Sequence, residues 1–472
     1  MSPVSPPCAF RSGPLVLQQA ALFTDLYQLT MAAGYHRERM AQPATFSLFA
    51  RRLPATRGFV VAAGLEPALE YLASLCFDAR SLAALAALGR FESDFLASLA
   101  DLRFTGSVRA VPEGTVLPAE TPLLEVTAPV IEAQLVETAL LNLCHVHTVL
   151  ASKAARVVLA AGDRPVSEFG LRRSQGIDAG LAAARAAWIA GCDSTSDVLA
   201  GATWGLPLSG TMAHAFVTAF PDELSAFRAY ARAFPDSAVL LIDTYDTLAG
   251  ARHATMVAGE LAAQGHRLAG VRLDSGDLLR LSREVRRILD EAGCSEVRIL
   301  ASGGLDEHDL ARLVADGAPI DGFGVGSRMV VSADAPSLDL VYKMVACGGR
   351  DVLKLSEGKE TWVGGKQVYR VLDAAGRIRE DRLALAEESA PPGTAPLLEP
   401  VMREGRLLRP HPPIAEARAR CRAGMDSLPE SARRLSEPEP WPVHSTDALR
   451  ARQAAALRSA RAQTGRDPAG FG

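Results

Sequence analysis

The feature that most constrains the fold is a repeat that begins near residue 165 and recurs roughly every 25–40 residues. In each repeat a short apolar run ends in a turn rich in functional groups, and a helical stretch follows. The turns are SEFGLRRSQG (167–176), LSGTMAH (208–214), LLIDTYDT (240–247), VRLDSGDL (271–278), ILASGGLDE (299–307) and GFGVGS (322–327). Such repeats predict parallel strands joined by right-handed crossovers. We expect an irregular (β/α) barrel, with an open doubly wound sheet as the alternative.

Charged side chains follow several of these strands, and in a barrel the carboxyl ends of the strands form the rim of the active site. Guanidinium groups suit a diphosphate or a substrate carboxylate, and the candidates are Arg172, Arg173 and Arg272. Carboxylates can accept sugar hydroxyls or hold Mg²⁺ through its water shell, and the candidates are Asp243, Asp246, Asp274 and Asp277. Capping of the next helix is the alternative for about half of these acids.

Two pairs of glycines come from the last two repeats, Gly303-Gly304 and Gly324-x-Gly326. In barrels, loops in these positions often hold a phosphate with their backbone N–H groups. An anionic sugar substrate that carries several phosphates therefore fits the inventory of the rim.

The stretch LSGTMAHAF (208–216) indicates a short strand, a turn at Gly210, and then Thr211 and His214. A histidine just beyond a buried strand is held on a rigid support beside a cleft, although a structural role is the alternative. The rim has no GxSxG elbow, Ser-x-x-Lys pair or Walker A motif, which favours positional and electrostatic chemistry over a serine nucleophile. His214 is then an acid/base group or a phosphoryl acceptor.

The rest of the chain divides by composition and periodicity into further regions. Helices are expected over 21–38 (with Thr24 as N-cap), 82–102 and 131–161, a strand over 45–50, and a hairpin over 399–408. The expected domains are an N-terminal arm (1–20), an α/β domain (21–150), the barrel with the active site (151–345), a C-terminal segment that packs on the N-terminal domain (346–440), and a helical tail (441–472).

Composition narrows the class of protein. The net charge of −4 gives no reason to expect nucleic acid as a partner. No uncharged apolar run reaches the roughly 20 residues of a membrane span, and prolines occupy the place of a signal-peptide core. The seven scattered cysteines argue against a disulfide framework or a zinc ribbon, and we expect a cytoplasmic protein.

Lysine is rare in this chain and its distribution is uneven. Of 50 Lys and Arg residues only five are Lys, and four of these are Lys343, Lys354, Lys359 and Lys366. A solvated loop is one interpretation of this cluster, and contact with phosphate is the other.

Taken together, the motifs resemble those of the nicotinate phosphoribosyltransferases, in the type II phosphoribosyltransferase family. The match runs from residue 21 to about 440, in order and with the family's spacing. It includes TDLYQLTM (24–31), EFGLRRSQG (168–176), TSDVLAG (195–201), GTMAHAF (210–216), LIDTYDT (241–247), VRLDSGDL (271–278), ASGGLDE (301–307), GFGVGS (322–327) and KLSEGKETWVGGKQVYR (354–370).

The resemblance implies an irregular α/β barrel plus an α/β N-terminal domain completed by the C-terminal segment. It also implies an enzyme of the ATP-dependent ligase class that acts in NAD biosynthesis as a homodimer. Such an enzyme joins nicotinate to 5-phosphoribosyl-1-diphosphate, gives nicotinate mononucleotide and diphosphate, requires Mg²⁺, and couples the transfer to ATP hydrolysis.

The resemblance also implies roles for individual residues. His214 matches a histidine that ATP phosphorylates transiently, and Asp274 matches an acceptor of ribose hydroxyls. Tyr27 and Phe169 match the aromatic residues on either side of the pyridine ring, Tyr27 coming from the other subunit. Cations around the base and diphosphate match Arg172 and Arg272, and the 5′-phosphate cradle matches Ser302, Gly303, Gly304, Gly324 and Gly326. Further ligand contacts are expected from Ser196, Thr211, Asp243, Asp246, Lys354 and Lys366.

One motif departs from the family pattern, because the chain has Ser194-Thr195-Ser196-Asp197 where the family usually has GTSN. Asp197 adds a charge near the base pocket, whereas neutral Ser196 stands where nicotinamide-using relatives carry Asp, which favours nicotinate. A non-catalytic phosphate-sensing barrel is disfavoured because the histidine, arginines and glycines are all present. A Schiff-base lyase is disfavoured because no Lys lies between Lys153 and Lys343.

Overall fold

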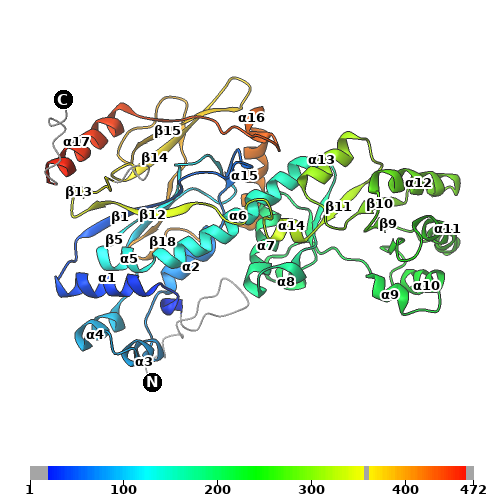
Figure 1. The fold of residues 1–472 in the computed structure, drawn as a ribbon, viewed down its shortest axis with the longest axis horizontal. Coiled ribbons are helices and arrows are strands. Elements are labelled where there is room, and N and C mark those ends of the chain that lie inside the picture. The colour runs from blue at the N-terminus through cyan, green and yellow to red at the C-terminus, as the bar shows by residue number, and fades with distance from the viewer. Residues whose placement is uncertain (1–19, 356–360, 464–472) are drawn as a thin grey trace, which may run out of the picture. The chain divides into compact units, whose positions relative to one another are not determined.

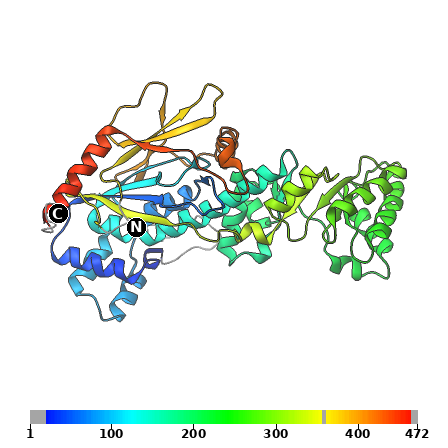
Figure 2. The same ribbon diagram turned by 45° about the horizontal axis from the view of Figure 1, so that its top comes forward.

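The computed structural model describes residues 20–355 and 361–463, so the arm expected over 1–20 lies outside the described residues except for its last residue. The chain forms two compact units (Figures 1 and 2). Unit 1 comprises Met1–Ser152 and Ser337–Gly472, and unit 2 comprises Lys153–Pro336.

Unit 2 contains a six-stranded parallel sheet in the order β7-β6-β11-β10-β9-β8. Its strands are β6 (Val166–Glu168), β7 (Ser194–Thr195), β8 (Val239–Leu241), β9 (Gly270–Leu273), β10 (Arg298–Ala301) and β11 (Gly322–Val325). The last strand pairs with the first, and the order otherwise follows the chain around a circle, which is the order of a barrel. A doubly wound sheet would instead reverse its order at a switch point. The sheet is interrupted between β7 and β8, where Leu208 makes a single bridge to Thr195, so the prediction of an irregular barrel is confirmed.

Helices connect the strands of unit 2 and cover the sheet, α11 beside β9 and α12 beside β10 (Figure 1). They are α7 (Ile177–Ala190), α8 (Val198–Trp204), α9 (His214–Thr218), α10 (Glu223–Ala233), α11 (Thr247–Ala263), α12 (Leu278–Glu291), α13 (Glu307–Ala315) and α14 (Ser327–Val330). Aspartate side chains cap several of them at the rim, including Asp246 on α11, Asp277 on α12 and Asp306 on α13. Each cap satisfies backbone N–H groups that have no partner within the helix.

Unit 1 is built on a seven-stranded sheet in the order β13-β12-β1-β5-β3-β17-β18. Its strands are β1 (Pro43–Ala50), β3 (Ser107–Ala110), β5 (Pro122–Pro129), β12 (Leu340–Cys347), β13 (Arg350–Asp351), β17 (Glu399–Arg403) and β18 (Arg406–Leu407). Strands from both ends of the chain pair within it, β12 with β1 and β17 with β3. The C-terminal segment therefore completes the N-terminal domain.

A second sheet of unit 1 has the order β16-β14-β15-β19, and β2 and β4 form a third. These strands are β2 (Val60–Val61), β4 (Val116–Leu117), β14 (Lys366–Leu372), β15 (Ile378–Leu385), β16 (Ala395–Pro396) and β19 (Val443–Ser445). The helices of the unit are α1 (Leu26–Arg37), α2 (Leu65–Ser74), α3 (Ala79–Ala87), α4 (Ser93–Asp101), α5 (Val130–Leu135), α15 (Ile414–Asp426), α16 (Glu430–Arg433) and α17 (Asp447–Gln463).

Three details of the predicted helices are wrong. The helix expected over 82–102 is two helices, α3 and α4, separated by Gly89 in a left-handed conformation. The N-cap of α1 is Asp25 instead of Thr24, whose hydroxyl donates a hydrogen bond to the carbonyl of Leu135. The helix expected over 131–161 is interrupted at Val136 and continues as α6 (Glu137–Ala161).

Helix α6 is long and apolar enough to cross a membrane by length and composition, but 72% of its most apolar window is buried inside the protein. Burial of this kind is typical of a core helix. Cys144, Cys192, Cys294, Cys347 and Cys421 are not disulfide-bonded. Cys76 is disulfide-bonded; the sequence argument was against a framework of several disulfides, and one bonded cysteine does not make such a framework.

Candidate active site

The turns at the carboxyl ends of the barrel strands line one cavity of about 800 Å³ in unit 2. Most of the rim residues expected from the sequence border it. They are Phe169, Arg172, Arg173, Ser196, Thr211, His214, Arg272, Asp274, Ser302, Gly303, Gly304, Gly324 and Gly326. Six separate loops contribute to this lining, because parallel strands bring their carboxyl ends to the same edge.

Arg272 is the centre of the polar network in the cavity. Its Nη1 donates to Asp274 Oδ1 at 2.8 Å and to Ser302 Oγ at 2.9 Å. Its Nε donates to Thr211 Oγ1 at 3.1 Å, and its Nη2 donates to the carbonyl of Met212 at 2.7 Å. Burial lowers the pKa of Arg272, and the carboxylate of Asp274 acts in the opposite direction. The side chain is 12% exposed, so a positive charge is held rigidly in the wall of the cavity.

His214 is the first residue of α9, and its side chain is 45% exposed at the cavity. Its Nδ1 lies 3.1 Å from Thr244 Oγ1, which fixes the orientation of the ring. Its Nε2 lies 3.9 Å from Asp274 Oδ2, beyond hydrogen-bonding distance. The imidazole is therefore oriented by the protein and open to a ligand.

The aspartates of the rim differ in what they do. Asp243 Oδ2 accepts hydrogen bonds from the Asp274 backbone N–H at 2.9 Å and from Ser275 Oγ at 2.6 Å. Asp243 Oδ1 is buried and has no hydrogen-bond partner. Asp246 and Asp277 cap α11 and α12 through the N–H groups of Ala249 and Arg280. The capping alternative therefore describes Asp246 and Asp277. None of Asp243, Asp246 and Asp277 borders the cavity, whereas Asp274 does.

The two glycine loops have conformations and contacts that only glycine allows. Gly303 has a φ of +96°, and a Cβ there would lie 1.8 Å from the carbonyl oxygen of Asp274. A Cβ on Gly324 would lie 2.5 Å from the ring of Phe169. At the start of the first loop, Ser302 is 4% exposed and its Oγ donates to Asp274 Oδ1 at 2.5 Å. The loops thus bring backbone close to the cavity without side chains in the way.

The loop after β6 presents Phe169, Arg172 and Arg173 to the cavity. It is anchored by Glu168, whose carboxylate accepts from Thr195 Oγ1 at 2.7 Å and from the backbone N–H of Gly170. Burial raises the pKa of Glu168, and the two hydrogen bonds oppose that effect. Both arginines are exposed, so their guanidinium groups are free to meet an anionic ligand.

The departure from the usual motif has a local explanation. Asp197 is 2% exposed and caps α8, because its Oδ1 accepts from the N–H groups of Leu199 and Ala200 at 2.9 and 3.1 Å. Ser196 borders the cavity and Asp197 does not. The carboxylate of Asp197 therefore caps α8 and does not line the cavity.

Comparison with known proteins places the chain among relatives over most of its length. Models of the nicotinate phosphoribosyltransferase N-terminal and C-terminal domains match residues 22–145 and 393–453. A nicotinate phosphoribosyltransferase of Mycobacterium tuberculosis, pncB2, is 49% identical over 88% of this chain and 89% of its own length. The chain belongs to the nicotinate phosphoribosyltransferase family. The enzyme of Bacillus subtilis is 40% identical over 90% of this chain and 92% of its own length.

Solved structures of two similar proteins agree with this family in fold. Human nicotinic acid phosphoribosyltransferase matches with a TM-score of 0.82 and 34% identity, over 92% of this chain and 99% of its own. A nicotinate-nucleotide pyrophosphorylase of Pyrococcus furiosus matches with a TM-score of 0.71 and 26% identity, over 86% and 95% of the two chains. The predicted fold class, an irregular barrel plus an α/β domain, is thereby confirmed.

Three residues that the sequence led us to expect near the ligands lie in unit 1. Tyr27, on α1, is 50% exposed and its hydroxyl donates to Glu137 Oε1 at 3.4 Å. Lys354 is exposed after β13. Lys366 is 2% exposed, and its Nζ donates to the carbonyls of Trp362 at 3.2 Å and Gly364 at 2.8 Å. This burial contradicts the phosphate contact predicted for Lys366.

Three polar residues at the site were not singled out from the sequence. Thr244 orients His214, Glu168 anchors the loop of Phe169, and Ser327 borders the cavity. Each lies inside a motif that marks the family, next to a residue that was chosen. Motif membership was the signal that could have found them; for Thr244 the contact itself is made to a residue 30 positions away.

Proposed function

We propose that this protein transfers 5-phosphoribosyl from 5-phosphoribosyl-1-diphosphate to nicotinate, giving nicotinate mononucleotide and diphosphate in NAD salvage. One observation carries the proposal: a single cavity gathers an oriented imidazole, a buried guanidinium, a carboxylate and two glycine loops. The names of the relatives support the choice of reaction.

The chemistry of the transfer needs no general base, since the pyridine nitrogen has no proton to lose. Diphosphate must leave with its charge balanced, and Arg272 and Arg172 supply cations for it. The ribose becomes positive in the transition state, and Asp274 lies where it can accept a ribose hydroxyl. Phe169 offers one aromatic face to a ring that is cationic in the product, and Tyr27 of a second subunit would offer the other.

The donor set fits Mg²⁺ held mainly through water and the diphosphate. Asp243 Oδ1 is a buried oxygen that lacks a partner. Among residues 20–355 and 361–463, no group of three His, Cys, Asp or Glu side chains is placed to hold a metal directly. When bound, the ion would neutralise charge on the leaving diphosphate. Asp274, which borders the cavity, would accept hydrogen bonds from the water shell of the ion, and Asp243 would support Asp274 through its backbone N–H.

The protein would then belong to the ATP-dependent ligase class, and we assign the coupling to ATP to His214. A ring nitrogen takes the γ-phosphoryl group and ADP leaves; water later cleaves the P–N bond and releases phosphate. A phosphoryl group on His214 adds negative charge beside Asp274 and Arg272, which changes how tightly each ligand is held. Thr244 keeps the ring in place in both states.

A product assay tests this proposal. Labelled nicotinate and phosphoribosyl diphosphate, with and without ATP, should give labelled nicotinate mononucleotide, faster with ATP. His214→Ala should abolish the effect of ATP and leave a slow transfer. Unchanged ATP dependence in His214→Ala would refute the phosphoryl role, and faster turnover of nicotinamide than of nicotinate would refute the choice of base.

A further inference from the structure

The loops after β10 and β11 border the same cavity and follow paired strands. Leu300 pairs with Gly322 and Ala301 with Phe323. Under the proposed function, the 5′-phosphate is held by backbone N–H groups of two glycine loops: residues 302–304 after β10, and residues 324–327, which run from the end of β11 to the start of α14. Such recognition depends on the distance between the loops, and glycine gives a loop little rigidity of its own.

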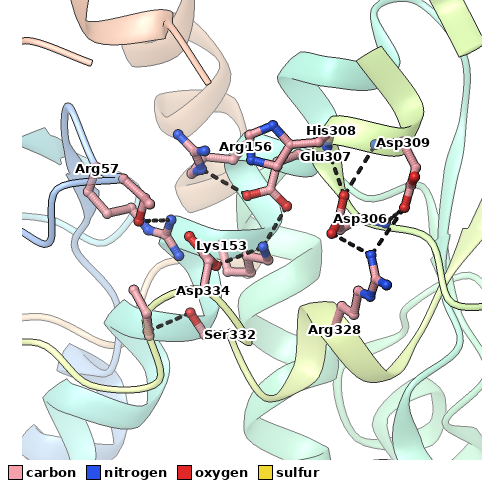
Figure 3. A network of polar contacts seen from close by, with 12 residues as sticks. Arg57, Lys153, Arg156, Asp306, Glu307, His308, Asp309, Arg328, Ser332 and Asp334 are labelled. Carbon is pink, nitrogen blue, oxygen red and sulfur yellow. Dashed lines mark hydrogen bonds and ion pairs between the residues drawn. The ribbon is translucent and has the colours of Figure 1, made fainter. Parts of the chain in front are cut away.

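An ion pair outside the cavity joins the two loops. Arg328 follows the second loop directly, and its Nη1 donates to Asp306 Oδ2 at 2.6 Å and to Asp309 Oδ2 at 3.2 Å (Figure 3). Asp306 follows the first loop after one residue and caps α13 with its other oxygen, which accepts from the N–H groups of His308 and Asp309. Neither Arg328 nor Asp306 borders the cavity, so neither can act by touching a ligand there.

A second link lies beside the first and is buried (Figure 3). Lys153 Nζ donates to Glu307 Oε2 at 2.5 Å and to Asp334 Oδ1 at 2.7 Å. Glu307 begins α13, and Asp334 lies beyond α14. Glu307 is fully buried; burial alone would raise its pKa, but Lys153 and Arg156 hold it below its ordinary value. The same two segments are therefore joined twice, once at the surface and once in the core.

We propose that Arg328 and Asp306 form a clamp that fixes the spacing of the two glycine loops, so that Arg328 is a positioning residue for the 5′-phosphate. The inference rests on the proposed function, which assigns the phosphate to these loops. The buried link holds the segments together in the folded protein, and the surface pair sets the final approach of their tips. Helix α14 has only four residues and therefore a small packing surface. The ion pair in its first turn fixes the position of the preceding loop, which the packing of a longer helix would otherwise do.

The test is binding of ribose 5-phosphate, which carries the 5′-phosphate and lacks the diphosphate. In Arg328→Gln, calorimetry should show a dissociation constant about tenfold larger than that of the wild type, because a displaced loop loses contacts with the phosphate. The KM for phosphoribosyl diphosphate should rise by a similar factor, with kcat changed less and the KM for nicotinate unchanged. A purely structural role would instead lower the folded fraction and leave every KM as it is.

Two further variants separate the clamp from other effects. Asp306→Ser keeps a capping hydroxyl for α13 but removes the nearer of the two carboxylates that Arg328 contacts and leaves Asp309. It should therefore weaken binding in the same direction as Arg328→Gln, by no more than that variant does. The double variant should be no worse than either single one. Arg312→Gln is the matched control, because Arg312 pairs with Asp309 at 3.3 Å on the solvent side and does not reach the second loop; it should bind like the wild type.

Each result decides the matter. If the wild type binds ribose 5-phosphate and both Arg328→Gln and Asp306→Ser bind it equally well, the clamp is wrong and the proposed function stands. If the wild type makes nicotinate mononucleotide but does not bind ribose 5-phosphate, the phosphate loops and the clamp are both wrong. If Arg328→Gln folds poorly, Arg328→Lys is used in its place. Its ammonium can reach one carboxylate, so it should keep part of the affinity of the wild type.

Discussion

The two units each hold a cluster of opposite charges, and the clusters serve different ends. In unit 1 the carboxylate of Glu125, which is 2% exposed, accepts from Arg109 Nη2 at 2.6 Å and lies 3.3 Å from Lys366 Nζ. These three charged side chains are paired with one another inside the protein. In unit 2, Arg272 and Asp274 form an equally close pair at 2.8 Å, but they face a cavity and a half-exposed imidazole. Buried charge alone does not mark a site; charge with access to a ligand does.

The largest effect expected from this contrast is on activity in unit 2. Arg272→Gln removes a fixed cation from the leaving diphosphate, and kcat/KM should fall about a thousandfold. The melting temperature, measured alongside, should change little by comparison. A loss of activity that merely followed a loss of folded protein would show that Arg272 acts as the charges of unit 1 do.

The matching change in unit 1 should affect stability. Lys366→Met leaves Glu125 without one of its cations in the interior, and the free energy of unfolding should fall by about 4 kcal/mol. Burial lowers the pKa of Lys366 and Glu125 opposes this, so the two groups are coupled within the fold. Activity per folded molecule should stay the same, and Lys343→Met, on the exposed face of β12, should change neither quantity. If Lys366→Met instead raised the KM for phosphoribosyl diphosphate and left stability normal, the prediction that Lys366 contacts a phosphate would be supported.

A smaller effect is expected where a charge is moved into the cavity. Ser196→Asp places a carboxylate beside an anionic base, and the KM for nicotinate should rise about tenfold. Asp197→Asn keeps the cap of α8 and should leave that KM unaltered. If Asp197→Asn instead improved nicotinate binding, the charge of Asp197 would be felt in the cavity despite its burial.

The smallest effect concerns Asp246, which caps α11 and does not border the cavity. Asp246→Ala should cost about 1 kcal/mol of stability, and Asp246→Asn less, because Asn also caps helices. Chemical denaturation measures both. An increase in the KM for phosphoribosyl diphosphate in Asp246→Asn would return this residue to the ligand contacts expected from its motif.

The barrel and most of its rim were predictable from sequence because strand–turn–helix repeats leave their polar turns at one edge. Thirteen residues expected there border one cavity. The same pattern cannot tell Asp243 from Asp246, since both stand in DTYDT. The structure separates them: Asp246 caps the first turn of α11, whereas Asp243 accepts a hydrogen bond from Ser275.

Other features depend on partners far away in the sequence. Lys366 shares a lysine-rich stretch with exposed Lys354, yet β14 places it beside Glu125, 241 residues earlier. The breaks at Gly89 and Val136 are short interruptions in runs that remain apolar and helical in composition. The order of six strands, in contrast, follows from chain order once a barrel is assumed, which is why the fold was the easier inference.

The most direct test of the account is a crystal structure of the protein with phosphoribosyl diphosphate and Mg²⁺. We expect the 5′-phosphate against Gly303, Gly304, Gly324 and Gly326, the diphosphate beside Arg272, and the imidazole of His214 facing the diphosphate. A ligand bound elsewhere, with His214 turned away from any phosphate, would contradict the assignment of this cavity as the active site.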